Sequence, residues 1–202
     1  MIVELAVKYG AIIVSDEVYE HLTFGVPHLP ITSLPGAAER TITISSAGKT
    51  FSFTGWKIGW LSGPAHLVAA VRTVKQFLTY SSGTPPFQSA IAVGLGLPDE
   101  FYTGIADQLR RKRDILAQGL RAAGFGVYNP SGTYFINVDT APLGIRDSVD
   151  LARRLPGLVG VAASRSRCSA IRREPSVREA CCVSLSARRP ASCRKPPNAS
   201  PP

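Results

Sequence analysis

The stretch Thr41–Trp60, TITISSAGKTFSFTGWKIGW, decides the fold of this chain of 202 residues. It begins with β-branched residues over Thr41–Ser45, which predict a β-strand. Two serines and a Gly-Lys-Thr turn around Lys49 follow, and Lys57–Leu61 predicts a further strand. The stretch therefore predicts two strands joined by a short segment that carries a lysine.

A second apolar run lies upstream of this stretch. Ala11–Ser15, AIIVS, predicts a fully buried strand of the kind found in parallel sheets. Residues 2–9 predict the end of a helix, and Gly10 suits the position just past a helix terminus. Ligands of open α/β sheets bind beyond the carboxyl ends of the strands, and Asp16 and Glu17 lie there. Asp16 is therefore a candidate binding residue.

The rest of the ordered chain alternates helices and strands. This alternation predicts an α/β fold, with a smaller α+β portion from about residue 99. Phe101, Ile105 and Leu109 recur at helical spacing in the longest predicted helix. The predicted elements downstream of residue 63 are helices at 64–79, 85–95, 99–123 and 147–154 and strands at 125–128, 133–138 and 158–162.

Composition changes sharply near residue 163. Residues 161–202 carry nine Lys and Arg against two Asp and Glu, so this segment holds +7 of the formal net charge of +9, and all four cysteines lie in it. Residues 164–202 show no sustained periodicity and too little apolar surface to offset chain entropy. We expect this tail to be disordered and to arise from out-of-frame translation. Without aromatic residues for stacking, its charge indicates at most non-specific polyanion binding and no specific nucleic-acid partner.

Targeting and metal signals are few. No charged start followed by an apolar core opens the sequence, and no apolar run approaches the roughly 20 residues that span a bilayer. We therefore expect a cytoplasmic protein without membrane contact. The cysteines show no Cys-x-x-Cys spacing, and His21, His28 and His66 are scattered, so we expect structural histidines and no metal site.

Lys49 has a rival interpretation as part of a phosphate loop. Gly48-Lys49-Thr50 is similar to the end of that loop in nucleotide hydrolases, and an apolar strand ending in Asp-Glu is similar to their magnesium-binding strand. The loop needs a glycine five residues before Gly48, where Thr43 stands. The acidic strand also precedes the lysine, which reverses the usual order. Both departures disfavour this interpretation.

Several motifs together resemble the class I aminotransferases, which are pyridoxal phosphate enzymes of fold type I. The motifs are DEVY from Asp16, SAGKTFS from Ser46 and GWKIGW from Gly55, in matching order and spacing. SSGTPPFQ from Ser81 and GTYFIN from Gly132 recur in the kynurenine, methionine and N-succinyldiaminopimelate transaminase branches. The resemblance covers roughly residues 1–162. Taken singly, each residue also fits an ordinary loop, turn or core position.

The resemblance implies a role for each of five residues. Lys49 is the catalytic residue, forming a Schiff base with pyridoxal 5′-phosphate and then moving a proton at the substrate's Cα. Asp16 pairs with the pyridine nitrogen, and Tyr19 hydrogen-bonds the phenolic oxygen. Ser46 and Lys57 hold the phosphate. The implied reaction passes an amino group between an amino acid and a 2-oxo acid, in a homodimer.

The resemblance also implies a domain division. Residues 1–98 correspond to the second half of the cofactor-binding large domain, with an incomplete, mostly parallel sheet, and residues 99–162 to part of a small α+β domain, followed by the 163–202 tail. Family members are longer, so we expect the chain to be truncated at its start. The arginine for the substrate carboxylate is not assigned to Arg172, Arg173 or Arg178. The alternative function is an inactive remnant, or one piece of a split gene.

Overall fold

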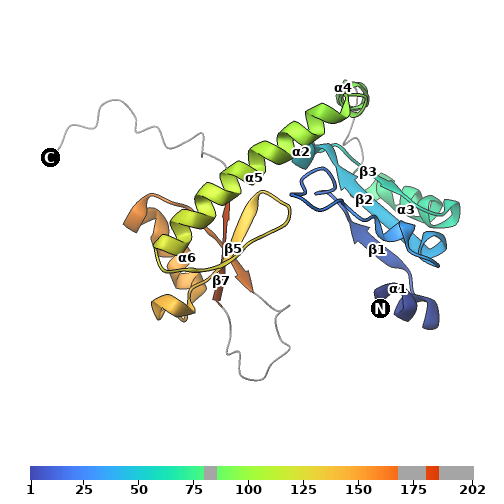
Figure 1. Ribbon diagram of the computed structural model, residues 1–202. Helices are drawn as coiled ribbons and strands as arrows, with labels where there is room; N and C mark the ends of the chain where they lie inside the picture. Colours follow the sequence, from blue (N-terminus) through green and yellow to red (C-terminus); the bar gives the residue numbers. More distant parts are fainter. Residues whose placement is uncertain (80–85, 168–180, 187–202) are drawn as a thin grey trace. The chain divides into compact units, whose positions relative to one another are not determined.

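The computed structural model describes residues 1–79, 86–167 and 181–186 (Figure 1). The chain divides into two compact units. The first comprises Met1–Arg110 with Ser131–Thr133, and the second comprises Arg111–Pro130 with the chain from Tyr134 onward. In the described part, no helix is long and apolar enough to cross a membrane. The domain boundaries expected from the sequence stay a prediction.

The first unit is built on a three-stranded sheet in the order β1-β2-β3. β1 (Ile13–Asp16) pairs in parallel with β2 (Thr41–Ser46), and β2 pairs in antiparallel fashion with β3 (Gly59–Ser62). The remaining helices of this unit are α1 (Ile2–Lys8), η1 (Ile31–Ser33), η2 (Ala38–Arg40), α2 (Ala47–Thr50), η3 (Thr54–Trp56), α3 (Ala65–Leu78), α4 (Phe87–Leu95) and the first half of α5 (Asp99–Ala122).

Helix α1 and the residues before β2 cover one face of β1. Val3 and Ala6 of α1 pack with Ile13 and Ala37 in a buried cluster. Gly10 has a φ of +63°, a left-handed conformation that glycine adopts without a Cβ clash, and it turns the chain from α1 toward β1. The predicted helix end and the strand are therefore confirmed, with β1 beginning two residues later than expected. The expected full burial of this strand is wrong for the described residues, because Ile13 is buried while Val14 is 63% exposed.

A second cluster surrounds the segment between β2 and β3. Ala47 and Ile58 pack with Ile91 of α4, and the rings of Phe51 and Trp60 pack against this group. The Trp56 ring lies 4.6 Å from Phe53 and 4.7 Å from Phe87, measured between centroids. Both tryptophans thus pack against other side chains, and they help to fix the connection that carries the two candidate lysines.

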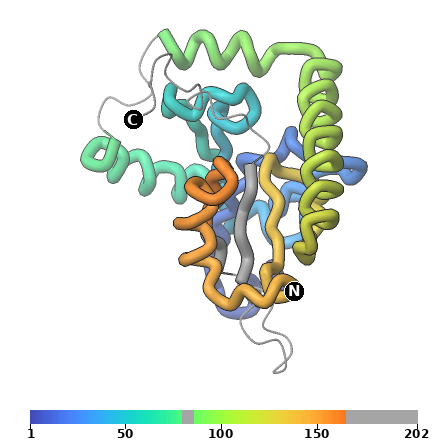
Figure 2. The backbone as a smooth tube through the Cα atoms, turned by 90° about the vertical axis from the view of Figure 1, so that its left-hand side faces the viewer, coloured from blue at the N-terminus to red at the C-terminus, as the bar shows by residue number. Residues whose placement is uncertain are grey.

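The second unit contains an antiparallel sheet in the order β4-β5-β7-β6. Its strands are β4 (Gly126–Tyr128), β5 (Phe135–Asp139), β6 (Ser164–Arg167) and β7 (Cys181–Ser186), and its helices are the end of α5, η4 (Ala141–Leu143) and α6 (Ser148–Val159). Ala117 and Leu120 of α5 pack on Ile136 and Val138 of β5. Leu151 of α6 joins the same cluster, so both helices cover one face of β5 (Figure 2).

Two expectations for the second unit differ from the structure. The strand predicted at 158–162 is wrong, because α6 continues to Val159 and ends at Gly160, whose φ is +67°. The tail from residue 163, predicted to be disordered, contains two strands of the sheet, Ser164–Arg167 and Cys181–Ser186, so the prediction is wrong for these residues. Residues 80–85, 168–180 and 187–202 lie outside the described residues, and with them Arg172, Arg173, Arg178 and the SSGTP part of the SSGTPPFQ motif.

Candidate functional site

The candidate residues gather where β1 and β2 end. Asp16 is the last residue of β1 and Ser46 the last of β2. Because the two strands are parallel, with Asp16 in register with Ile44, their carboxyl ends lie at the same edge of the sheet. The backbone continues this pairing past the strand, since the N–H of Glu17 donates to the carbonyl of Ile44 at 2.8 Å. This is the edge at which α/β sheets bind ligands.

Asp16 and Ser46 also share one face of the sheet. Side chains alternate along a strand, and residues in register point to the same side. Asp16 and its partner Ile44 therefore face the same way as Ser46, two residues after Ile44. Ser15 and Glu17 face the opposite way. The exposure pattern of β1 agrees, since Asp16 is exposed and Glu17 is buried.

Lys49 follows β2 after three residues. Ser46 has extended backbone, with φ −153° and ψ 143°, and begins the short helix α2. The turn of α2 is closed by the N–H of Phe51, which donates to the carbonyl of Ala47 at 2.9 Å. Ala47, Gly48 and Thr50 are buried while Lys49 is partly buried. The packing of its neighbours thus holds the Lys49 backbone at the end of β2.

Lys57 lies directly after η3, two residues before β3, the strand that returns beside β2. Its φ of 56° and ψ of 39° place it in the left-handed region, which is uncommon for a residue with a Cβ. Its side chain is exposed. The carbonyl of the next residue, Ile58, accepts from the N–H of Ala47 at 3.1 Å, which ties the Lys57 segment to the start of α2. Both lysines are therefore attached to the same end of β2.

Tyr19 lies in the turn directly after β1. The N–H of Glu20 donates to the carbonyl of Glu17 at 3.0 Å, and the N–H of Leu22 donates to that of Tyr19 at 2.8 Å. These bonds give the segment a compact, helix-like course. Tyr19 is partly buried. The structure thus brings all five predicted residues to one end of the first unit's sheet, and their individual roles stay predictions.

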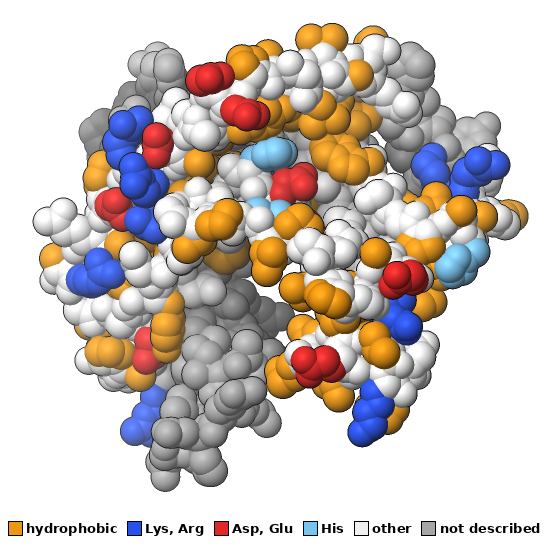
Figure 3. All heavy atoms as spheres, turned by 45° about the vertical axis from the view of Figure 1, so that its right-hand side comes forward, with side chains coloured by type: hydrophobic (Ala, Val, Ile, Leu, Met, Phe, Trp, Pro, Cys, Tyr) orange, Lys and Arg blue, Asp and Glu red, His pale blue; other side chains and the backbone are white. Residues whose placement is uncertain are grey.

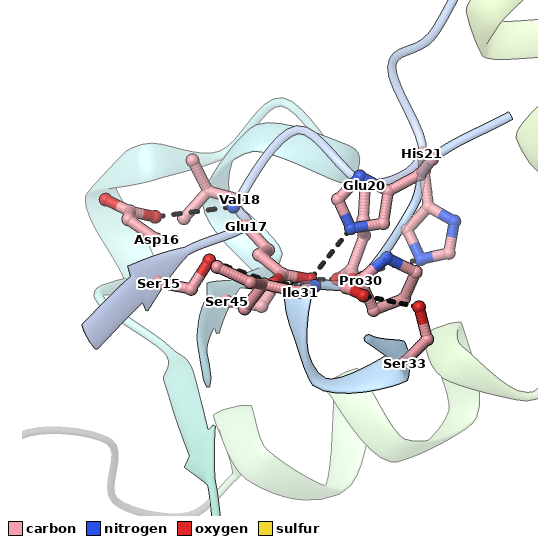
Figure 4. Close-up of polar contacts among 11 residues, drawn as sticks. Ser15, Asp16, Glu17, Val18, Glu20, His21, Pro30, Ile31, Ser33 and Ser45 are labelled. Carbon is pink, nitrogen blue, oxygen red and sulfur yellow. Dashed lines mark hydrogen bonds and ion pairs between the residues drawn. The ribbon is translucent and has the colours of Figure 1, made fainter. Parts of the chain in front are cut away.

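Glu17 sits at the centre of a polar cluster behind this edge (Figure 4). Its side chain is 7% exposed. The carboxylate accepts from Ser15 Oγ at 2.9 Å and from the N–H of Ile31 at 3.1 Å, and its Oε2 lies 2.8 Å from His28 Nε2. Because an ionised carboxylate only accepts, His28 donates in this pair. The loop of residues 18–31 is thereby fastened at both ends to the terminus of β1.

Burial raises the pKa of Glu17, since a charge loses its hydration there. The hydrogen bonds from His28, the Ile31 N–H and Ser15, with the attraction of His28, outweigh burial, so the pKa of Glu17 lies below its ordinary value. The group is therefore an ionised, fully engaged carboxylate near neutral pH. Asp16, the residue before it, has an exposed side chain.

A second contact joins the same turn to β2. Ser45 Oγ donates to Glu20 Oε1 at 2.6 Å, and Ser45 is buried. The sequence assigns no role to Glu17 beside Asp16 and predicts a structural His28. Neither the Glu17–His28 pair nor the Ser45–Glu20 bond has a sequence signal, because the partners are 11 and 25 residues apart.

The side chains at this edge form a recognisable set of donors and acceptors. They include one exposed carboxylate, one phenol, one hydroxyl and two primary amines. A carboxylate suits a protonated ring nitrogen, a hydroxyl and an ammonium group suit a phosphate, and a second amine can attack a carbonyl carbon. Among the described residues, no group of three or more His, Cys, Asp or Glu side chains is placed to hold a metal ion.

Comparison with known proteins gives consistent matches. The family model described as "Aminotransferase class I and II" matches residues 1–187. The probable N-succinyldiaminopimelate aminotransferase DapC of Mycobacterium tuberculosis is 50% identical over 163 residues, covering 80% of this chain and 41% of the relative. The methionine aminotransferase of Escherichia coli is 40% identical over 152 residues, covering 75% of this chain and 39% of the relative.

Solved structures agree with these matches. The N-succinyldiaminopimelate aminotransferase structure from Mycobacterium tuberculosis superposes with a TM-score of 0.81 and 46% identity, over 92% of this chain and 47% of that one. The α/β fold class predicted from the sequence, that of a partial fold type I enzyme, is confirmed by this likeness. The chain spans about two fifths of the length of the curated relatives it matches.

Proposed function

The chain belongs to the aminotransferase class I and II family, and on that premise we propose that it transfers an amino group between an amino acid and a 2-oxo acid with pyridoxal 5′-phosphate. The observation that carries the proposal is the gathering of Asp16, Ser46, Lys49 and Lys57 at the shared end of β1 and β2. The nucleotide-hydrolase interpretation of Lys49 finds no counterpart among the family and relatives matched.

The donor set at this edge fits the cofactor. When bound, pyridoxal 5′-phosphate supplies an aldehyde that bonds amines and a ring that accepts electrons when a Cα proton leaves. Asp16 would hold the ring nitrogen in its protonated form, and Tyr19 would donate to the phenolic oxygen. Ser46 and Lys57 would bind the phosphate through a hydroxyl and a positive charge.

Lys49 would act twice. Its amine would hold the cofactor through the aldehyde carbon, with loss of water, and as a free amine beside bound substrate it would take up the proton that leaves the substrate's Cα. The rigid course of α2 supports this assignment, because buried neighbours on both sides limit how far the lysine's backbone can move. The same proposal includes a homodimer and the division into domains at residues 1–98, 99–162 and 163–202.

A second candidate is a chain of this family that has no catalysis by itself. The observation in its favour is that the chain covers 41% of the length of the DapC relative. One experiment separates the two candidates: pyridoxal 5′-phosphate is added to the purified chain, the mixture is reduced with borohydride, and peptides are analysed by mass spectrometry.

The proposed function predicts a pyridoxyl adduct on Lys49 that is absent from Lys49→Ala. Lys75→Ala is the matched control, because Lys75 is exposed on α3 and lies outside the candidate site. An adduct spread over several surface lysines, or none at all, would sink the claim that this chain binds the cofactor. If the adduct forms on Lys49, the chain with cofactor, before reduction, is assayed for transfer of an amino group from an amino acid to a 2-oxo acid. Such transfer would decide against the second candidate.

A further inference from the structure

The polar cluster around Glu17 has no role in the proposed function, yet it lies beside two residues that do, Asp16 and Tyr19. Glu17 is the residue after Asp16 and precedes Tyr19 by two. A buried carboxylate costs free energy unless it is fully hydrogen-bonded, and Glu17 is held by Ser15, His28 and the Ile31 backbone. A group so placed fixes the backbone on which it sits.

The direction of Glu17 determines the direction of Asp16. Consecutive side chains in extended backbone point to opposite faces. Glu17 is fastened to the covered face by Ser15 on its own strand and by two residues of the following loop, so Asp16 must point to the other face, with Ser46. Asp16 itself accepts a long hydrogen bond from the Val18 N–H, at 3.3 Å.

The turn that carries Tyr19 is fixed from the same side. His28 and Ile31 belong to the far end of the loop that begins at Val18, and both reach back to one carboxylate (Figure 4). Glu20 adds a second attachment through Ser45 of β2. Polar side-chain contacts, rather than a helix or strand, therefore hold the turn and the end of the loop together.

We propose that Glu17, held by His28, is a positioning residue that fixes Asp16 and Tyr19 for the cofactor's ring. The inference rests on the proposed function for its purpose, although its structural content does not need the cofactor. It assigns Glu17 no contact with cofactor or substrate. The three donors keep the carboxylate in place, and the carboxylate keeps the turn in place.

The first test uses the chain without cofactor. Amide hydrogen exchange at Val18 reports whether Asp16 keeps its turn, because the Val18 N–H donates to Asp16 Oδ1. Glu17→Gln retains the shape but loses the charge, and His28→Gln removes the ring while leaving the carboxylate with two donors. We expect exchange at Val18 to rise about tenfold in both variants, the effect of losing one hydrogen bond to a charged group. Unchanged exchange in both overturns the inference.

The second test uses the cofactor and a double-mutant cycle. Absorbance titration gives the dissociation constant of pyridoxal 5′-phosphate for the original chain, Asp16→Asn, Glu17→Gln and the double variant. If Glu17 acts through Asp16, Glu17→Gln weakens binding about tenfold alone and little in the Asp16→Asn background. Additive losses overturn the inference, since they indicate general destabilisation. Glu39→Gln, an exposed carboxylate on η2, is the control.

The two proposals fail in different ways. If the original chain binds no cofactor, the proposed function fails, and the Val18 exchange still decides the positioning of Asp16. If the original chain binds and Glu17→Gln binds equally well with normal Val18 exchange, the positioning role alone fails. Should Glu17→Gln not fold, His28→Gln carries the same comparison.

Discussion

Ser46 of β2 lies in register with Gly59 of β3, and a Cβ on Gly59 would come within 3.3 Å of the Ser46 Cβ. The same Cβ would lie 2.9 Å from the carbonyl oxygen of Ser45. Real Cβ atoms do not approach a backbone oxygen this closely, so the two strands approach there only because residue 59 is a glycine. The position of Ser46, the candidate phosphate-binding serine, therefore depends on residue 59 having no Cβ.

Gly59→Ala is the first prediction. We expect it to lower the free energy of unfolding by about 1–3 kcal/mol, as overpacking does in cores, and to weaken cofactor binding by displacing Ser46. Both tryptophans, Trp56 and Trp60, belong to the first unit, so their fluorescence in urea reports its unfolding. Gly55→Ala is the control, because a Cβ there meets nothing within 4 Å. Equal losses in both variants would contradict the argument.

We expect Lys57→Gly to raise the stability of the first unit and to weaken cofactor binding. A residue with a Cβ in the left-handed region costs about 1 kcal/mol, so glycine should stabilise the first unit by a similar amount. Losing the ammonium group should weaken binding of pyridoxal 5′-phosphate at least tenfold. Lys57→Arg keeps the charge and the strain, and we expect it to bind more tightly than Lys57→Gly. Unchanged affinity in Lys57→Gly would remove Lys57 from the phosphate site.

The lowered pKa of Glu17 makes the first unit sensitive to acid. A carboxylate whose folded pKa lies below its unfolded pKa contributes stability above the unfolded value. That contribution is lost as pH falls through the folded pKa. We therefore expect the stability difference between the original chain and Glu17→Gln to be full at pH 7 and to shrink as pH falls below about 4.3, the ordinary pKa of a glutamate. Urea unfolding followed by tryptophan fluorescence at several pH values checks this, and a constant difference would contradict it.

Asp147 begins α6 in the second unit. Its Oδ1 accepts from the N–H groups of Val149 at 2.8 Å and Asp150 at 3.0 Å, which lowers the pKa of Asp147. Asp147→Ala should therefore speed amide exchange at these two residues and loosen the first turn of α6. Arg154→Ala is the control, because it removes the exposed ion pair with Asp150 and leaves both reporter residues in place. Equal exchange in the two variants would exclude a capping role.

Local patterns predicted much of this structure. The β-branched runs before Asp16 and Ser46 and the helical spacing from Asp99 onward depend on neighbouring residues alone, and β1, β2 and α5 appear where these patterns lie. The helix predicted at 99–123 is α5, which ends at Ala122, and Gly124 follows it with a φ of +89°. The position of Asp16 at the ligand-binding end of a strand followed from a general rule about α/β sheets, whereas Ser46 was a candidate only through the family resemblance.

The features that the sequence did not predict depend on structure beyond the local pattern, such as contacts between residues far apart in the chain. The short apolar run from Leu158 fits a strand or the end of a helix equally well, and continuation of α6 from its Asp147 cap decided for helix. The Glu17–His28 pair joins residues across a loop rich in proline, for which no periodicity exists. The antiparallel course of β3 arises because the connection after β2 turns back at α2 and η3.

The outer edge of β1 bears on how the protein behaves at high concentration. In the described ranges β1 is an edge strand; Ile12, just before it, is 57% exposed and Val14, within it, is 63% exposed. Apolar side chains, orange in Figure 3, are widespread on the surface drawn there. Edge strands of this kind are templates for pairing between molecules. Ile12→Lys should therefore reduce light scattering at high protein concentration without altering tryptophan fluorescence, whereas Ile13→Lys should unfold the buried cluster. Self-association through the strand that presents Asp16 would set the concentration at which any cofactor titration can be trusted.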